Sequence, residues 1–242
     1  MTIWGLTALD LGALAFFLVA WLGFAPYLRW RGRRAEVVAS AMIDHRRVWM
    51  EALLKREVRI ADTAIVGHIM STAAFFASTT VIVIGALLGV LVNMGRGATT
   101  SSVSWLAISP PTPLEIKVVL IIVVAVYAFQ SFTWAIRQAN FAAVMMGAAP
   151  PPSAIGPELL KRLATSMGSI ITGVAESYDN GMRSYYFAFS AVAWVVSPVL
   201  FFLATTGVVV LLLRRQTKSR TALALKEIAA ARSQSALSSK QA

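Results

Sequence analysis

The sequence predicts an all-α integral membrane protein, an uncleaved bundle of about four transmembrane helices with amphipathic helices on its cytoplasmic side. Three observations lead to this prediction. The chain of 242 residues is 57% hydrophobic and only 14% charged, whereas a soluble globular chain carries about 25% charged residues. Four stretches are apolar over the roughly 20 residues that a helix needs to cross a bilayer. Basic residues gather in the segments between these stretches, the pattern that orients membrane proteins.

The four apolar stretches define the expected spans. Because lipid offers no hydrogen-bond partners to the backbone, each stretch is expected to be helical. The spans cover residues of about 3–28, 63–92, 118–136 and 186–213, within a transmembrane domain of residues 1–215. A basic tail, 216–242, follows and is expected to be partly disordered. The first basic residue, Arg29, comes after the first stretch, which therefore reads as a retained helix and not as a signal peptide.

Two connecting segments mix charged and apolar residues in a way that is typical of amphipathic helices. The segment Arg29 to Ala61 carries nine basic and four acidic side chains among its apolar ones, which suits a helix in the membrane interface or a hairpin just outside it. The run from Leu159 to Ser177 predicts a second, short amphipathic helix, whose uncharged part is too short to span a bilayer.

The distribution of lysine and arginine predicts the orientation. The loops 29–62 and 137–185 hold thirteen of the 22 basic residues, which places both loops in the cytoplasm and the N-terminus outside. With four crossings the tail would also lie outside, although Arg214 and Arg215 directly follow the last apolar stretch. A fourth segment that re-enters at Ser197-Pro198 would return the tail to the cytoplasm. Both alternatives remain open at this stage.

Small residues recur along one face of the second apolar stretch at steps of three, four or seven, and they include a GxxxG pair. Such residues let two helices approach closely in lipid. The pattern favours packing inside the bundle; the alternative is a contact face for another protein or another copy of the chain. The members of this candidate helix-packing stripe are Gly67, Ser71, Ser78, Gly85 and Gly89.

Polar and aromatic side chains form stripes on the third and fourth stretches. They are Tyr127, Gln130, Ser131, Trp134, Arg137 and Gln138 on the third, and Arg183, Tyr186, Ser190, Trp194 and Ser197 on the fourth. These stripes are expected to face the bundle interior, where they make interhelical hydrogen bonds or line a polar path. His68 is expected to form a hydrogen bond between helices, with a proton relay as the alternative. The candidate intramembrane polar residues are His68, Gln130 and Ser190.

Charged residues converge at one membrane boundary, because the second stretch begins there, the third ends there and the fourth begins there. Asp62 is expected to approach Arg137 or Arg183 and to lock the helices together; a binding site and a solvated charged face are the alternatives. Asp10, near the opposite boundary, is expected to reach head groups or water. The candidate boundary cluster consists of Glu57, Arg59, Asp62, Arg137, Asn140, Asn180, Arg183 and Tyr186.

The sequence offers no candidate metal, cofactor or catalytic residues. It contains no cysteine and two histidines, which excludes disulfides and thiolate metal sites. It contains neither a zinc-protease motif nor an evident nucleophile next to a base. The net charge of +11 fits loops that contact anionic lipid head groups rather than nucleic acid.

Four motifs resemble the signatures of a family of bacterial membrane proteins that is known only as domain of unknown function 599. They are Arg56-Glu57-Val58-Arg59-Ile60-Ala61-Asp62, Phe75-Phe76-Ala77-Ser78-Thr79-Thr80, Arg137-Gln138-Ala139-Asn140-Phe141 and Arg183-Ser184-Tyr185-Tyr186-Phe187-Ala188. The resemblance extends from about Leu9 to Arg215. It implies a multi-pass protein of the bacterial inner membrane and no particular activity, cofactor or catalytic residue.

The sequence therefore favours a non-enzymatic scaffold, accessory or partner-binding protein of the inner membrane. Its expected partners are the bilayer and another membrane protein or further copies of the chain. The alternative is a small oligomeric transporter or channel with a polar path between the third and fourth predicted helices. A water-accessible polar cavity would favour transport, and a dry bundle with an exposed stripe of small residues would favour a partner protein.

Overall fold

The computed structural model describes residues 5–32, 38–97, 113–218, 224, 227 and 228. Within these ranges the chain is helical and contains no strand, which confirms the predicted all-α class. The elements are α1 (Ala8–Gly32), α2 (Val38–Leu54), α3 (Ile60–Gly97), α4 (Pro113–Gly147), the 3-10 turn η1 (Pro152–Ala154), α5 (Pro157–Val196) and α6 (Pro198–Lys218).

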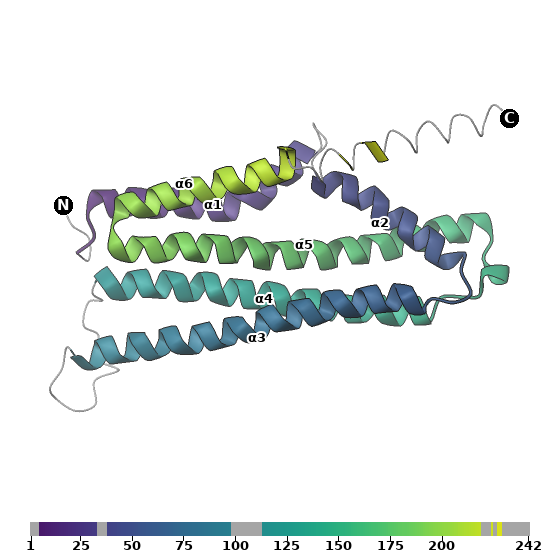
Figure 1. The fold of residues 1–242 in the computed structure, drawn as a ribbon, viewed down its shortest axis with the longest axis horizontal. Coiled ribbons are helices and arrows are strands. Elements are labelled where there is room, and N and C mark those ends of the chain that lie inside the picture. The colour runs from purple at the N-terminus through teal and green to yellow at the C-terminus, as the bar shows by residue number, and fades with distance from the viewer. Residues whose placement is uncertain (1–4, 33–37, 98–112, 219–223, 225–226, 229–242) are drawn as a thin grey trace.

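The helices form one elongated bundle with α5 in its middle (Figure 1). Helices α3 and α4 lie on one side of α5, and α1 and α6 lie on the other. At one end, here called the hairpin end, α5 joins α6, α1 and α4 begin, and α3 ends. At the opposite end, here called the α2 end, α2 crosses α5, and the chain turns from α4 through η1 into α5.

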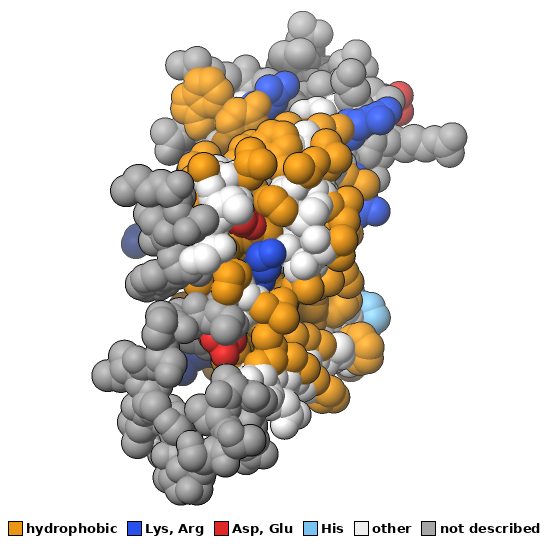
Figure 2. Space-filling view, turned by 90° about the vertical axis from the view of Figure 1, so that its left-hand side faces the viewer, with side chains coloured by type: hydrophobic (Ala, Val, Ile, Leu, Met, Phe, Trp, Pro, Cys, Tyr) orange, Lys and Arg blue, Asp and Glu red, His pale blue; other side chains and the backbone are white. Residues whose placement is uncertain are grey.

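Four described helical segments are long and apolar enough to cross a membrane, by length and composition: α1, residues 60–94 of α3, α4, and residues 198–217 of α6. This confirms the predicted membrane protein with about four spanning helices. Viewed from the hairpin end, hydrophobic side chains cover much of the described surface, and acidic and basic side chains lie next to each other near its centre (Figure 2).

The predicted fourth span, 186–213, differs from the structure because it is not one helix. Helix α5 ends at Val196, and α6 begins at Pro198 and runs back along it. Tyr186 meets Arg215, and Ser190 meets Thr205, so the two arms are antiparallel. The predicted re-entrant turn at Ser197-Pro198 therefore lies where the chain reverses.

The sequence around this turn explains why the helix stops. Ser197 has extended backbone angles, with φ −161° and ψ 152°. Its hydroxyl accepts a hydrogen bond from the Leu200 N–H at 3.1 Å, which makes it an N-cap for α6. Pro198 follows at the first helical position, where its missing N–H has no helical partner to lose.

The amphipathic run 159–177 is also longer than predicted, since it forms the first half of the 40-residue helix α5. No proline interrupts the chain between Pro157 and Pro198. The polar turns in its middle, around Asp179 and Arg183, line a cavity and continue the helix without a break. Helix α5 thus has a charged half at the α2 end and an apolar half at the hairpin end.

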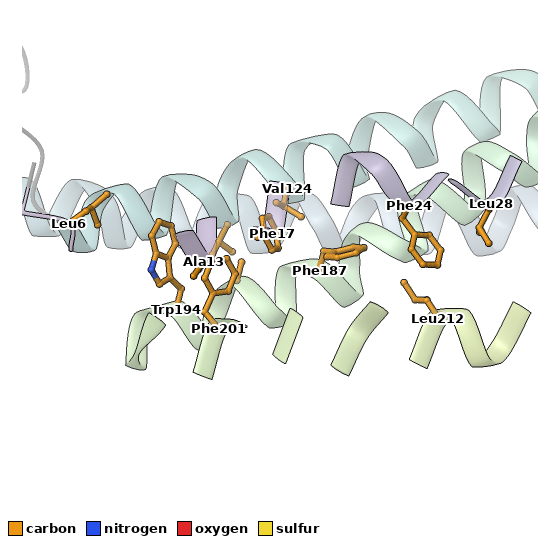
Figure 3. Packing of buried hydrophobic residues seen from close by; sticks show 12 residues of the cluster. Leu6, Ala13, Phe17, Phe24, Leu28, Val124, Phe187, Trp194, Phe201 and Leu212 are labelled. Atoms are coloured by element: carbon orange, nitrogen blue, oxygen red, sulfur yellow. The ribbon is translucent and has the colours of Figure 1, made fainter. Parts of the chain in front are cut away.

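Aromatic side chains from α1, α5 and α6 fill the core of the hairpin end (Figure 3). Phe17 and Phe187 meet edge to face with their ring centroids 5.8 Å apart, and Trp194 stacks on Phe201 at 5.1 Å. All four side chains are fully buried. Such pairs add about 0.5–1.5 kcal/mol beyond the burial of their area, so they stabilise this end of the bundle.

A second core lies at the α2 end. The apolar face of α2 places Met50, Leu53 and Leu54 against α5 and α4, and all three are fully buried. The opposite face carries Asp44, whose side chain is 78% exposed. This confirms the amphipathic helix predicted within residues 29–61.

Two glycines let α5 approach its neighbours closely. A Cβ at Gly181 would lie 2.7 Å from the ring of Phe132 on α4, and one at Gly168 would lie 3.1 Å from the Cα of Arg47 on α2. Both positions are buried. The close packing that was predicted for α3 is therefore found on α5.

Candidate functional site

The predicted boundary cluster is divided into separate groups in the structure, and Asp62 does not join the arginines expected for it. The Asp62 carboxylate is 2% exposed and accepts a hydrogen bond from Trp49 Nε1 at 2.7 Å. Arg56 Nη1 lies 3.0 Å and 3.1 Å from its two oxygens. The partners of Asp62 therefore come from α2 and the short turn after it. The prediction of an Asp62 pair with Arg137 or Arg183 is wrong, because Trp49 and Arg56 already contact both oxygens of the carboxylate.

Arg59 connects the beginning of α3 to the end of α4. Its guanidinium donates to the carbonyl oxygens of Ala149 and Pro150 at 2.6 Å and 2.7 Å. Met146 contributes a third, longer contact at 3.5 Å. Ala149 and Pro150 follow the end of α4 at Gly147, and a cationic donor satisfies carbonyls that have no partner in a helix. Arg59 is thus a structural clamp, while Glu57 beside it is exposed.

The remaining members of the predicted cluster surround the middle of α5 and the facing part of α4. Arg183 donates to Asn180 Oδ1, and its guanidinium carbon lies 5.9 Å from the centre of the Phe24 ring. Tyr186 accepts a hydrogen bond from Arg215 of α6 at 2.7 Å. On α4, Arg137 lies over the ring of Phe141 at 5.8 Å, and Asn140 donates to its own helix at the Ile136 carbonyl.

A cavity of about 340 Å³ opens beside Asn180 and Arg183, where the end of α1, the first turns of α2, the middle of α5 and the end of α6 meet. One part of its wall is apolar and the other is charged. The charged and polar residues that line it are Arg29, Arg46, Thr172, Glu176, Asp179, Asn180, Arg183 and Gln216. The apolar ones are Ala25, Leu28, Ile43 and Ala175.

The cations of this cavity are incompletely paired. Within the described chain, Arg29 and Arg46 make no hydrogen bond and no ion pair shorter than 4 Å. Burial lowers the pKa of the Arg46 guanidinium, and the carboxylates of Asp179 and Glu176 oppose this shift without cancelling it. Arginine nevertheless keeps its charge in proteins. The cavity therefore holds positive charge that its own carboxylates only partly balance.

A second cavity of about 540 Å³ lies between α4 and α5. Its wall contains Tyr127, Gln130, Ser131, Trp134 and Arg137, which belong to the polar and aromatic stripe that the sequence singled out on α4. Thr133 of α4 and Ser177 and Asn180 of α5 complete the wall. Asn180 thus borders both cavities, one on each side of α5. On α5 the predicted stripe is less uniform, because Ser190 and Trp194 are buried in the core.

The candidate intramembrane polar residues have different environments. Ser190 is buried and donates to the Phe187 carbonyl at 2.8 Å. Gln130 is exposed and lines the α4–α5 cavity. His68 is exposed and lines a third cavity, of about 450 Å³, between α2, α3 and α5. Its imidazole makes no hydrogen bond to another helix in the described chain, so the predicted interhelical bond is wrong.

The small-residue stripe of α3 does not pack inside the bundle. Gly67, Ser71, Ser78, Gly85 and Gly89 are all exposed, and a Cβ at any of the three glycines would meet no atom within 4 Å. The prediction of packing within the chain is therefore wrong. Helix α3 packs mainly on α4, through residues such as Ala73 and Ala77, and turns this stripe outward.

Asp10 is buried at the hairpin end, in contrast to the predicted contact with head groups or water. It accepts hydrogen bonds from Trp194 Nε1 at 2.8 Å and from the Thr7 N–H at 3.0 Å. Lys117 Nζ lies 3.9 Å from its carboxylate. The Thr7 hydroxyl accepts from the Asp10 N–H in return, as in a capping box. A Thr-x-x-Asp pattern at the start of the first apolar stretch was the sequence signal for this role.

Among the residues that the structure describes, no three histidine, aspartate or glutamate side chains form a group that could hold a metal ion. The polar groups are instead structural clamps and cavity walls between apolar helices. The fold therefore defines an all-α integral membrane protein of uncharacterised activity. The chain belongs to the family described as "Protein of unknown function, DUF599", whose model matches residues 12–221. No curated protein and no solved structure matches the chain.

Proposed function

We propose that the protein is a non-enzymatic membrane scaffold that crosses the bacterial inner membrane five times and assembles through the exposed face of α3. The five passes are α1, the hairpin-end part of α3, most of α4, the apolar half of α5, and α6. The hairpin end lies outside, and the α2 end with the C-terminal tail lies in the cytoplasm. Three arginines away from the hairpin end support this placement: Arg29 and Arg214 near the ends of α1 and α6, and Arg137 in the second half of α4.

The spacing between charged residues along α1 and α4 supports the same placement. Asp10 and Lys117 meet at the hairpin end. Arg29 follows Asp10 by 19 residues, and Arg137 follows Lys117 by 20. At a rise of about 1.5 Å per residue, each interval is close to the 30 Å of a hydrocarbon core. With four crossings, Arg214 and Arg215 would lie outside, against the usual distribution of basic residues. A fifth pass brings both to the cytoplasmic side.

The exposed face of α3 is the observation that carries the scaffold proposal. Ser71, Ser78 and Gly85 recur every seven residues, and Phe75 and Ile82 lie between them at steps of four and three. Phe75 is 66% exposed and Ile82 is 73% exposed. Large and small side chains thus alternate along one face of α3, here called the seam. When two such helices pack, the large side chains of one fit into the gaps beside the small side chains of the other.

The seam is complementary to itself, because it contains both the protruding and the recessed positions. A second copy of α3 is therefore the partner that we propose for it, related by a two-fold axis. Since lipid is as apolar as the side chains, close packing rather than hydrophobicity would stabilise this contact.

A substitution at Gly85 tests the scaffold proposal. Gly85→Leu fills the recessed position and is expected to weaken self-association about tenfold or more, because the two backbones can no longer approach. Gly207→Leu on α6 is the matched control, since Gly207 is also exposed with no atom within 4 Å of its Cβ position. The readout is the mass of the purified full chain in mild detergent as a function of concentration.

Cross-linking identifies the partner in that experiment. The chain has no cysteine, so Ser78→Cys introduces a single thiol, which should form a disulfide-linked dimer in membranes. Val123→Cys on the exposed face of α4 should not. A monomer at all concentrations, with no dimer from Ser78→Cys, would show that this face of α3 contacts lipid and would refute the scaffold proposal.

The α4–α5 cavity favours a second candidate function, a small transporter. Its polar wall fits the path that the sequence suggested between these helices, and Gln130 lies on it. The aromatic core of the hairpin end would have to open for a solute to pass. Gln130→Cys should then react with a membrane-impermeant thiol reagent from either side of the membrane. Reaction from the cytoplasmic side alone would exclude this candidate.

A further inference from the structure

The cavity between α1, α2, α5 and α6 combines three properties in one place. Its wall has an apolar part, formed by Ala25, Leu28 and Ile43. Its cationic part is formed by Arg29, Arg46 and Arg183, and its anionic part by Glu176 and Asp179. Its volume of about 340 Å³ is at the lower end of the range for small-ligand sites. An amphiphile with separated charges would match all three parts.

The cations are available to a ligand. Among the described residues, Arg29 and Arg46 make no hydrogen bond and no ion pair within 4 Å. The carboxylates of Asp179 and Glu176 act on Arg46 from a longer distance. Arg183 is oriented by Asn180 and by the ring of Phe24, which restrain its guanidinium beside the cavity. A guanidinium presents its N–H donors in a fixed fork, and this fork matches the oxygen atoms of a phosphate.

The carboxylates determine which phosphate compound fits best. An inorganic phosphate among the arginines would leave Glu176 and Asp179 near a second negative charge. A ligand that also carries an ammonium group would place positive charge there instead. The side-chain oxygen of Gln216, which also lines the cavity, is buried and accepts no hydrogen bond from the described residues, so it offers one more acceptor.

The position of the cavity indicates where such a ligand would come from. It lies beside the last turns of α1 and α6. The same turns of α1 also carry Tyr27 and Trp30, which are 38% and 50% exposed. Aromatic and basic side chains gather at the level of lipid head groups. On the membrane placement of the proposed function, this cavity opens at the cytoplasmic leaflet.

We infer that the cavity binds the head group of a zwitterionic aminophospholipid, with its phosphate at Arg29, Arg46 and Arg183 and its ammonium at Glu176 and Asp179. The acyl chains leave along Ala25 and Leu28 toward the bilayer. A lipid at this site joins α1, α2, α5 and α6 at the boundary where the membrane half of the bundle meets its cytoplasmic half. The proposal uses the membrane placement but none of the α3 residues.

Lipid retention by the purified full chain tests this inference. The protein is delipidated in detergent and offered phosphatidylethanolamine, phosphatidylglycerol or inorganic phosphate, and bound molecules are counted by native mass spectrometry. Phosphatidylethanolamine should be retained most strongly. Arg46→Gln should weaken its retention about tenfold, as expected for the loss of a charge-assisted hydrogen bond. Arg47→Gln, one residue further on α2 and on a half-exposed side chain, should leave it unchanged.

Two further variants sharpen the test. Asp179→Asn keeps the shape of the side chain but removes its charge, and it should abolish the preference for phosphatidylethanolamine over phosphatidylglycerol. If Arg46→Gln does not fold, Arg29→Gln at the exposed end of α1 takes its place. Equal effects of Arg46→Gln and Arg47→Gln would overturn the inference. So would an unchanged lipid preference in Asp179→Asn, or binding of inorganic phosphate that displaces the lipid completely.

The outcome is separable from that of the scaffold proposal. If lipid retention fails while Gly85→Leu still alters self-association, only the lipid site is refuted. If Gly85→Leu has no effect but lipid retention follows the predicted pattern, only the scaffold proposal fails.

Discussion

Two carboxylates are buried among the described residues, and each is held by a tryptophan. Asp62 accepts a hydrogen bond from Trp49, and Asp10 accepts one from Trp194. A basic side chain adds to each group, Arg56 at 3.0 Å and Lys117 at 3.9 Å. An indole donates a hydrogen bond without adding charge, so it satisfies a buried carboxylate while its ring packs among apolar side chains. These residues therefore stabilise the two ends of the bundle.

Replacement of Asp62 should destabilise the protein markedly. Asp62→Ala leaves the indole N–H of the half-buried Trp49 without its acceptor, and the loss of such a partner costs about 1–3 kcal/mol. The loss should appear as a lower melting temperature of the detergent-solubilised chain. Asp44→Ala is the matched control, because Asp44 is 78% exposed and its contact with Arg47 is long, at 3.8 Å. Equal melting temperatures of the two variants would contradict this account of Asp62.

At the scale of elements, α5 organises the bundle because every other long helix contacts it. Helix α3 does so through Phe76 and Thr80, which meet Tyr185. The first half of α5 carries most of its charged side chains. Its second half lies among α1, α4 and α6. Gly168 and Gly181 bring it close to α2 and α4. Its break at Ser197-Pro198 then returns the chain as α6, so one hairpin replaces the single fourth span that hydropathy suggested.

A methyl group at Gly181 should push α5 away from α4. The new Cβ would lie 2.7 Å from the Phe132 ring, and Phe132 is fully buried. Gly181→Ala is therefore expected to cost about 1–3 kcal/mol, the usual range for an overpacked core. Gly23→Ala on α1 has open space around its Cβ and should instead be neutral or slightly stabilising, by up to about 1 kcal/mol. Thermal unfolding of both variants checks the difference.

At the scale of the whole molecule, the two ends of the bundle differ in chemistry. The hairpin end is closed by the aromatic cluster of Phe17, Phe187, Trp194 and Phe201. The cavities instead surround the middle of α5, between this cluster and the α2 end.

Cysteine labelling should locate the five proposed passes. Because the chain lacks cysteine, single thiols can be introduced at Asn93, at Ser153 and at Ala224, all of which are exposed. A membrane-impermeant reagent added to intact cells should label Asn93→Cys only. Ser153→Cys and Ala224→Cys should react only after the membrane is permeabilised. Labelling of Ala224→Cys from outside would mean that residues 186–213 cross the membrane once, and the five-pass placement would be wrong.

The sequence by itself determined the class of the protein and the approximate extent of most helices. Apolar length is sufficient for this, since lipid forces any such segment to be helical. It also identified Ser197-Pro198 as a possible turn and the residues of the α4 polar stripe, because capping and side-chain polarity are local properties.

The tertiary structure decided which residues meet. Asp62 pairs with Arg56 rather than with Arg137 or Arg183, and the small residues that pack closely are on α5 rather than α3. Neither outcome follows from spacing along one helix, since the rotation of each helix about its axis depends on the shapes of its neighbours. The cavity around Arg29, Arg46 and Arg183 arises for the same reason: three separate helices bring its charges together. Hydropathy measures how well a segment suits lipid, but it carries no information on which side chains face one another.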